Sequence, residues 1–172
     1  MISKKLLAQR TYVIADSLKI NQTVVNKVIN TYSEVLKNEV FSGKSVNIFG
    51  LARIEASTDT SKYVSTLAYH AKMVAERCST SYYTCLSILN KYLEDVRESV
   101  LNGENANIIG VVTFTPVVDL DGSYNLHANV SSSIKKDLEL KSSGDFSVRV
   151  HTSKLLKSQS LRKYKMEGGV AG

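Results

Sequence analysis

The apolar positions follow a helical period in two long stretches that lie sixty residues apart. The first stretch contains Val24, Val25, Val28, Ile29, Tyr32, Val35, Leu36 and Val40. The second contains Ile88, Leu89, Tyr92, Leu93, Val96 and Val100. Spacing of three or four residues places apolar side chains on one face of a helix. Each stretch therefore predicts an amphipathic helix that buries one face.

A shorter helical pattern precedes each long helix, and a glycine follows it. The first shorter pattern begins at Leu7 and ends near Lys19-Ile20, and the second runs from Leu67 to Cys78. Asn21 is a suitable N-cap for the first long helix, and one of Ser79, Thr80 and Ser81 is suitable for the second, because a side-chain oxygen there accepts a free backbone amide. Gly43 and Gly103 stop the long helices, since glycine readily takes the left-handed conformation found at helix ends.

The segments after these glycines predict short strands. Strands are expected at 46–48 and 51–54 around Gly50, and at 106–109 and 111–114 around Gly110. The second copy continues through a turn at Asp121-Gly122 into a strand that alternates at Tyr124, Leu126, Ala128 and Val130. A further strand is expected at 147–150, followed by a short helix over 154–156 capped by Ser153. No core-forming pattern continues beyond residue 158.

The two copies align at an offset of sixty residues without a gap. Identical pairs include Leu7 and Leu67, Asn30 and Asn90, Tyr32 and Tyr92, Gly43 and Gly103, Asn47 and Asn107, and Gly50 and Gly110. A repeat of this length indicates one supersecondary unit used twice. We expect an α+β fold with a truncated unit at 1–58, a fuller unit with a β-ribbon at 61–158, and a basic, glycine-rich tail at 159–172.

The hairpin of each unit resembles the HU/IHF family of bacterial DNA-bending proteins, in which two helices precede a three-stranded sheet with a first hairpin of the form Val-x-Leu-x-Gly-Phe-Gly-x-Phe. The first copy reads Val46-Asn47-Ile48-Phe49-Gly50-Leu51-Ala52-Arg53-Ile54, and the second reads Ala106-Asn107-Ile108-Ile109-Gly110-Val111-Val112-Thr113-Phe114. Only the first motif glycine is kept; Ala52 and Val112 replace the second. The resemblance implies two tandem HU/IHF-like units.

The residues that this family uses on DNA have no counterpart here. Its β-ribbon arms carry an Arg-Asn-Pro tip whose proline wedges between base steps in the minor groove. The first copy leaves no room for an arm. In the second copy the ribbon tip is Asp119-Leu120-Asp121-Gly122-Ser123, which is acidic, and the only proline, Pro116, lies at the ribbon base. No DNA-contacting residue is therefore carried over.

The positive charge is concentrated near the end of the chain. The net charge is +6; residues 1–134 hold 13 basic and 12 acidic side chains, and residues 135–172 hold nine and four. This asymmetry fits contact with nucleic acid, and it equally fits a solvated basic ending. The candidate contact residues for nucleic acid or a partner are Lys135, Lys136, Arg149, Lys154, Lys157, Arg162, Lys163 and Lys165.

Other chemistry-bearing residues form no catalytic pattern. The three histidines, His70, His127 and His151, lack metal-ligand spacing, and the two cysteines, Cys78 and Cys85, are expected to be buried, reduced thiols. Asp119 and Asp121 suit a hairpin turn better than a metal site. Tyr82 and Tyr83 suit packing at a helix start better than stacking on bases. We therefore expect no enzyme activity, no cofactor and no metal.

Two functions remain open. The first is a structural protein of a tailed-phage virion, because HU/IHF-like folds occur in ring proteins of crAss-like phages; its partners would be further copies in a ring and other virion proteins at the portal, neck or tail. The second is a nucleoid-type binder of double-stranded DNA that uses the basic C-terminal segment. No apolar run reaches the roughly 20 residues of a membrane helix, and residues 1–5 lack a signal-peptide pattern. Assembly in the cytoplasm of a bacterial host is expected.

Overall fold

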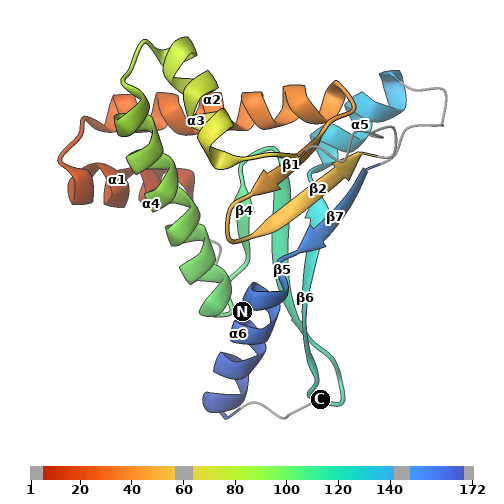
Figure 1. The fold of residues 1–172 in the computed structure, drawn as a ribbon. Helices are drawn as coiled ribbons and strands as arrows, with labels where there is room; N and C mark the ends of the chain where they lie inside the picture. The colour runs from red at the N-terminus through yellow and green to blue at the C-terminus, as the bar shows by residue number, and fades with distance from the viewer. Residues whose placement is uncertain (1–5, 57–63, 142–147, 169–172) are drawn as a thin grey trace.

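In the computed structural model the described residues are 6–56, 64–141 and 148–168, with side chains described except at 137–141. The described residues form six helices and two small sheets, so the predicted α+β class is confirmed. The two sheets lie beside each other; in the view of Figure 1, α2 crosses above them and α4 descends beside them. No helix in the described part of the chain is long and apolar enough to cross a membrane.

The sixty-residue repeat is present in the secondary structure. The first repeat contains α1 (Leu7–Leu18), α2 (Gln22–Phe41), β1 (Ser45–Ile48) and β2 (Ala52–Ala56). The second contains α3 (Leu67–Cys78), α4 (Tyr82–Leu101), β4 (Ala106–Ile108) and β5 (Val112–Val118). The helices of the two repeats begin and end at positions that differ by sixty. The prediction of two helices and a hairpin in each copy is confirmed.

The predicted helix signals act as expected. The Asn21 side chain accepts a hydrogen bond from the backbone amide of Thr23 at 2.8 Å, and the Ser81 hydroxyl accepts one from the amide of Thr84 at 3.2 Å. Gly43 and Gly103 follow the two long helices with φ values of 81° and 78°. These left-handed conformations are accessible to glycine without a steric penalty. Local signals thus set both ends of α2 and α4.

The second repeat continues into a β-ribbon and then a helix. Strand β6 (Tyr124–Val130) returns antiparallel to β5, which gives the sheet order β4-β5-β6. Its side chains alternate between buried or half-buried and exposed, as predicted. Helix α5 (Ser132–Lys141) follows β6 and was not predicted, although Ile134 and Leu138 stand four residues apart in its sequence.

The first repeat is completed from the far end of the chain. Strand β7 (Val148–Thr152) pairs antiparallel with β2, and the short β3 (Val64–Ser65) pairs with β1, so the sheet order is β3-β1-β2-β7. Helix α6 (Lys154–Met166) follows β7 as α5 follows β6. Residues 7–56 thus have two helices and two strands, and strand β7, which was expected to belong to the second unit, lies in the first sheet.

The two sheets share one register. Ala52 pairs with Thr152 in the first sheet, and its counterpart Val112 pairs with Val130 in the second. The residue after the third strand then donates its amide to a carbonyl of the repeated hairpin, from Ser153 to Leu51 and from Ser131 to Val111, each at 2.8 Å. Strands β6 and β7 contact each other. The two sheets therefore repeat the same pairing pattern, and they meet at β6 and β7.

Helix α6 is longer than the helix expected over 154–156. Ser153 caps it as predicted and accepts a hydrogen bond from the amide of Leu156. The helix then continues to Met166, across the expected tail boundary at residue 159, and residues 169–172 of that tail lie outside the described residues. Leu156 and Ser160 are buried on its inner face, where α6 packs on α4 and β6. Tertiary contacts therefore extend this helix beyond its sequence pattern.

The helices of the two repeats bury their apolar faces against each other. Helix α1 contacts α4, α2 contacts α3, and α2 contacts α4. The buried positions on α2 recur on α4 sixty residues later: Val25 and Cys85, Val28 and Ile88, Ile29 and Leu89, Tyr32 and Tyr92, Leu36 and Val96, Val40 and Val100. The repeats therefore pack on each other within one chain, which the hydrophobic pattern had left open.

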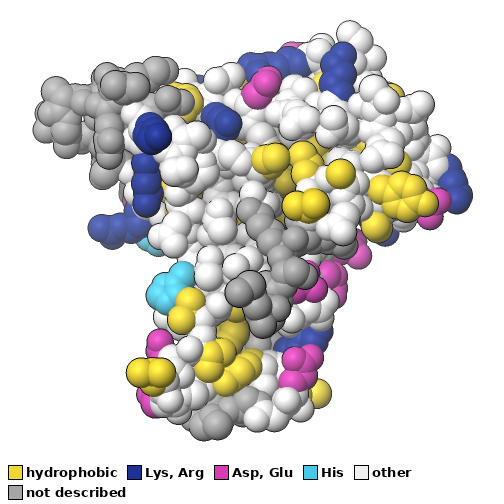
Figure 2. Space-filling view, turned by 180° about the vertical axis from the view of Figure 1, so that it is seen from behind, with side chains coloured by type: hydrophobic (Ala, Val, Ile, Leu, Met, Phe, Trp, Pro, Cys, Tyr) yellow, Lys and Arg dark blue, Asp and Glu magenta, His cyan; other side chains and the backbone are white. Residues whose placement is uncertain are grey.

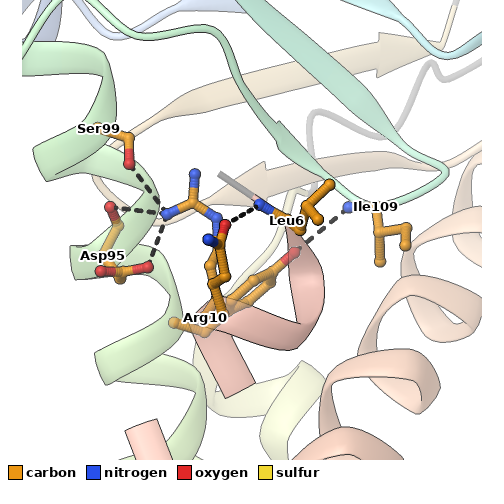
Figure 3. A network of polar contacts seen from close by, with 7 residues as sticks. Leu6, Arg10, Asp95, Ser99 and Ile109 are labelled. Carbon is orange, nitrogen blue, oxygen red and sulfur yellow. Dashed lines mark hydrogen bonds and ion pairs between the residues drawn. The ribbon is translucent and has the colours of Figure 1, made fainter. Parts of the chain in front are cut away.

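One buried ion pair joins the repeats inside this interface (Figure 3). Nη1 of Arg10 on α1 lies 2.6 Å from Oδ2 of Asp95 on α4 and donates to the Ser99 hydroxyl at 3.0 Å. The Arg10 residue is 1% exposed, and the Asp95 side chain is 17% exposed. A cation that has lost its hydration needs such partners. Arg10 is thus held in the core by α4.

The corresponding position on the other side of the interface holds a neutral residue. His70 on α3 is fully buried; its Nε2 lies 2.8 Å from the Ser65 hydroxyl, and its ring meets those of Tyr32 and Tyr69 edge-on at 6.0 Å. Burial lowers the pKa of His70 from its ordinary value of 6.5 to about 4. The imidazole is therefore uncharged at neutral pH.

We expect the Asp95→Ala variant to lower the free energy of unfolding by about 3 kcal/mol, because it leaves the Arg10 guanidinium buried without its carboxylate. Asp16→Ala is the control: Asp16 pairs with Lys19 at 3.7 Å, but its side chain is 70% exposed, so a change within about 0.5 kcal/mol is expected. Denaturant unfolding at neutral pH measures both. Equal losses in the two variants would contradict the structural role of the Arg10–Asp95 pair.

We expect His70 to destabilise the fold on acidification. The unfolded chain protonates His70 near pH 6.5 and the folded chain only near pH 4, so the unfolded state binds more protons between these values. Stability should fall by about 3 kcal/mol from pH 6.5 to pH 4 on this account. His70→Gln should lose this part of the pH dependence, and His127→Gln, an exposed control, should keep it. The free energy of unfolding is measured from pH 7 to pH 4. An equal fall in both variants would refute the assignment.

Candidate interaction surfaces

The candidate basic residues do not gather on one surface. Five lie on α6, namely Lys154, Lys157, Arg162, Lys163 and Lys165; Arg149 lies on β7, and Lys135 and Lys136 lie on α5. All are exposed except Lys163, which is half-buried and donates to the Asn102 side chain. Helices α5 and α6 lie at opposite ends of the β-layer (Figure 1). The structure thus brings together the α6 residues and leaves the α5 pair apart.

The rear face of the molecule carries scattered charge. Figure 2 shows Lys and Arg side chains as separate groups near the edges of this face, with acidic side chains among them and hydrophobic side chains between them. A DNA-binding surface typically presents a continuous basic stripe. This face does not have one.

The outer faces of the two sheets differ in charge. On the first sheet, Glu55 lies 3.4 Å from Nη2 of Arg53 and 2.8 Å from Nε2 of His151, and Arg149 is its partner across β2 and β7. The equivalent positions on the second sheet are Thr113, Thr115, His127 and Asn129. The two halves are therefore alike in backbone and unlike in surface chemistry.

The tip of the β5–β6 ribbon is a closed, acidic turn with one apolar side chain. The Asp121 carboxylate accepts hydrogen bonds from the hydroxyl and the amide of Ser123 at 2.6 and 2.9 Å, and these bonds lower the pKa of Asp121. Asp119 accepts from the same hydroxyl at 3.2 Å. Leu120, between the two carboxylates, is fully exposed. The tip combines two negative charges with a protruding leucine.

Helix α6 holds this ribbon in place. The Tyr164 hydroxyl donates to the carbonyl of Gly122 at 2.9 Å, and the Tyr164 ring stacks on Tyr124 with centroids 5.0 Å apart. The Tyr124 hydroxyl is also hydrogen-bonded to Ser160. The ribbon is therefore fastened to the last turns of α6 and is not a free arm.

A groove opens at the other end of α6. It has a volume of about 500 Å³ and lies between the β1–β2 turn, α4 and the first turn of α6. Its apolar lining comes from Phe49, Leu93 and Leu155, and Glu94 and Arg97 supply its charged groups. Phe49 is 60% exposed and Leu155 is 61% exposed. Two large apolar side chains thus face solvent across one groove.

The equivalent place in the other half is different. Ile109 and Ser133 stand where the groove has Phe49 and Leu155. The Lys37 side chain lies against Gly110, so close that a Cβ added to this glycine would lie 2.7 Å from Nζ. By contrast, the nearest atom to a Cβ at Gly50 is Cδ of Arg97 at 3.9 Å. The apolar side chains that line the groove are therefore not repeated in the other half.

The remaining candidate groups are the cysteines, the tyrosine pair and the metal-ligating side chain types. Cys78 and Cys85 are free and buried, as predicted. Tyr82 and Tyr83 meet edge-on at 5.4 Å at the start of α4. In the described ranges, no cluster of three or more His, Cys, Asp or Glu side chains could hold a metal ion.

Sequence reasoning missed the groove and the apolar tip, although each leaves a signal. Leu120 stands between two aspartates in a turn, where an apolar side chain gains nothing from local structure. Leu155 follows the N-cap Ser153 and points away from the buried face that holds Leu156. These signals can be interpreted only once the fold is known, because nothing in the sequence spacing relates Phe49 to Leu155.

Comparisons of this chain with protein-family models, curated proteins and solved structures found no significant match.

We expect Tyr164→Phe to loosen the ribbon tip. The variant loses the hydrogen bond to the Gly122 carbonyl and keeps the stack on Tyr124, so a loss of about 1 kcal/mol in stability is expected. Amide exchange of the peptides that cover 116–126 should become faster. Tyr12→Phe, on the exposed face of α1, is the matched control and should change neither quantity. Unchanged exchange in Tyr164→Phe would show that α6 does not fasten the tip.

Proposed function

We propose that this chain is a non-enzymatic structural protein of a tailed-phage virion, with HU/IHF-like units packed in a ring or collar at the portal, neck or tail. Its partners in this proposal are further copies of itself and other virion proteins. The proposal rests on the folded arrangement of the repeats together with the motif resemblance of Gly50 and Gly110.

The observation that carries the proposal is that one chain supplies both halves of a dimer-like body. Each half has two helices, strands in the same register and a final helix, and the order matches that of the HU/IHF family. The helical faces are already buried against each other. The remaining surfaces of the two halves are unlike, so a copy offers two different faces through which it can join its neighbours. Such heterologous contacts close into rings when the rotation between copies allows it.

The ribbon supports a protein partner better than a DNA partner. The Asp119 and Asp121 carboxylates at its tip would be repelled by phosphates. The tip is also fastened to α6 through Tyr164 and Gly122, so it is not free to reach around a duplex. At the paired positions Thr113–Asn129 and Thr115–His127, the second sheet carries no lysine or arginine, where a duplex requires positive charge.

One observation favours DNA binding as a second candidate function. Helix α6 carries five basic side chains, and four of them are exposed. A cluster of this kind attracts phosphates without sequence preference.

The two functions predict different masses in solution and a different dependence of DNA binding on salt. We expect the purified protein to form a species larger than a monomer, measured by light scattering after gel filtration, and to show the same mass with and without duplex DNA at low and physiological salt. Phosphate binding weakens steeply as salt rises, because counterions are released.

A monomer that binds duplex DNA with a steep salt slope would overturn the structural proposal and favour the second candidate. The charge-reversal variant Lys157→Glu/Arg162→Glu on α6 serves as a control in the same assay. Any weak DNA binding should be lost in this variant, and the assembled mass should be kept.

A further inference from the structure

We infer that copies of this chain join head to tail, with the ribbon tip of one copy seated in the apolar groove of the next. The inference rests on the proposed self-association and names its two faces. The tip is the turn 119–123 with Leu120 at its apex. The groove is the one lined by Phe49, Leu93 and Leu155.

The two faces match in shape and polarity. Leu120 is fully exposed, and Val118, two residues before it, is also exposed, so the tip presents apolar side chains to solvent. The groove holds about 500 Å³, which suits a leucine side chain and its neighbours. Phe49 and Leu155 are the exposed apolar walls that such an end would cover.

The charges at the two faces are complementary. Asp119 and Asp121 flank Leu120, and the hydrogen bonds from Ser123 keep Asp121 in its charged form. Arg97 lines the groove, and Lys154 is exposed next to Leu155. Glu94 also lines the groove and opposes this attraction. Within the groove the charges of Arg97 and Glu94 offset each other, and Lys154 in the adjoining first turn of α6 adds one positive charge to meet the two carboxylates of the tip.

A chain cannot fill its own groove. The groove lies at the first turn of α6 through Leu155, and the tip is fastened near its last turn through Tyr164. Nine residues of helix separate these points by about 14 Å along the axis. The contact must therefore form between copies, and because tip and groove are different surfaces, it propagates from one copy to the next.

The test uses single charge introductions at exposed positions, which leave the core unchanged. Leu120→Asp replaces the apolar side chain at the apex of the tip with a charge, and Leu155→Asp does the same at the wall of the groove. Each variant should weaken self-association by about tenfold to a hundredfold. Tyr83→Asp, at an exposed position at the start of α4, is the matched control and should associate like the wild type. Sedimentation velocity over a concentration series measures all four proteins, and circular dichroism checks that each is folded.

Mixing the two defective variants distinguishes this contact from any other. The Leu120→Asp protein keeps its groove and the Leu155→Asp protein keeps its tip, so an equimolar mixture should form a one-to-one dimer that grows no further. A mixture that stays monomeric, or variants that assemble like the wild type, would overturn this contact and leave the proposed function standing. A wild type that is monomeric at every concentration would overturn both.

Discussion

The fold depends on the burial of two helical hairpins against each other. Helices α2 and α4 each carry an apolar stripe, and a single repeat has too little structure of its own to cover it. The stripes meet within one chain, and α1 and α3 close them from either side. This contact places the two hairpins of strands next to each other. It also lets β7 reach β2, since β6 and β7 come together at the junction of the halves.

At a few polar positions in the interface the two repeats carry different residues, and these differences compensate one another. Val35 on α2 is replaced by Asp95 on α4, and His70 on α3 is replaced by Arg10 on α1. The arginine and the aspartate pair across the interface, and the valine and the neutral histidine occupy the other side. A buried charge tolerates only a matching partner. The two halves are therefore not interchangeable, although their backbones are alike.

The two halves also differ at the surface, so the molecule has two unlike faces. One half has the open groove between Phe49 and Leu155, and the other has Ile109 and Ser133 at those places. One half has a ribbon with an acidic tip, and the other has its third strand supplied from far along the chain. A protein that grips one partner symmetrically with both halves would need two like faces. An object with two unlike faces suits a head-to-tail assembly.

The sequence by itself determined the parts of the structure that depend on near neighbours. The periodic apolar stripes predicted α1 to α4, Asn21 and Ser153 predicted caps, and Asp121-Gly122 predicted the ribbon turn, because each acts within a few residues. Tertiary structure alone decided that β7 pairs with β2, that α6 continues to Met166, and that Phe49 and Leu155 share a groove. Strand pairing and burial join residues about a hundred positions apart, as with Ile54 and Val150. Local periodicity carries no information about which distant strand completes a sheet, since any strand of suitable alternation offers the same backbone hydrogen bonds.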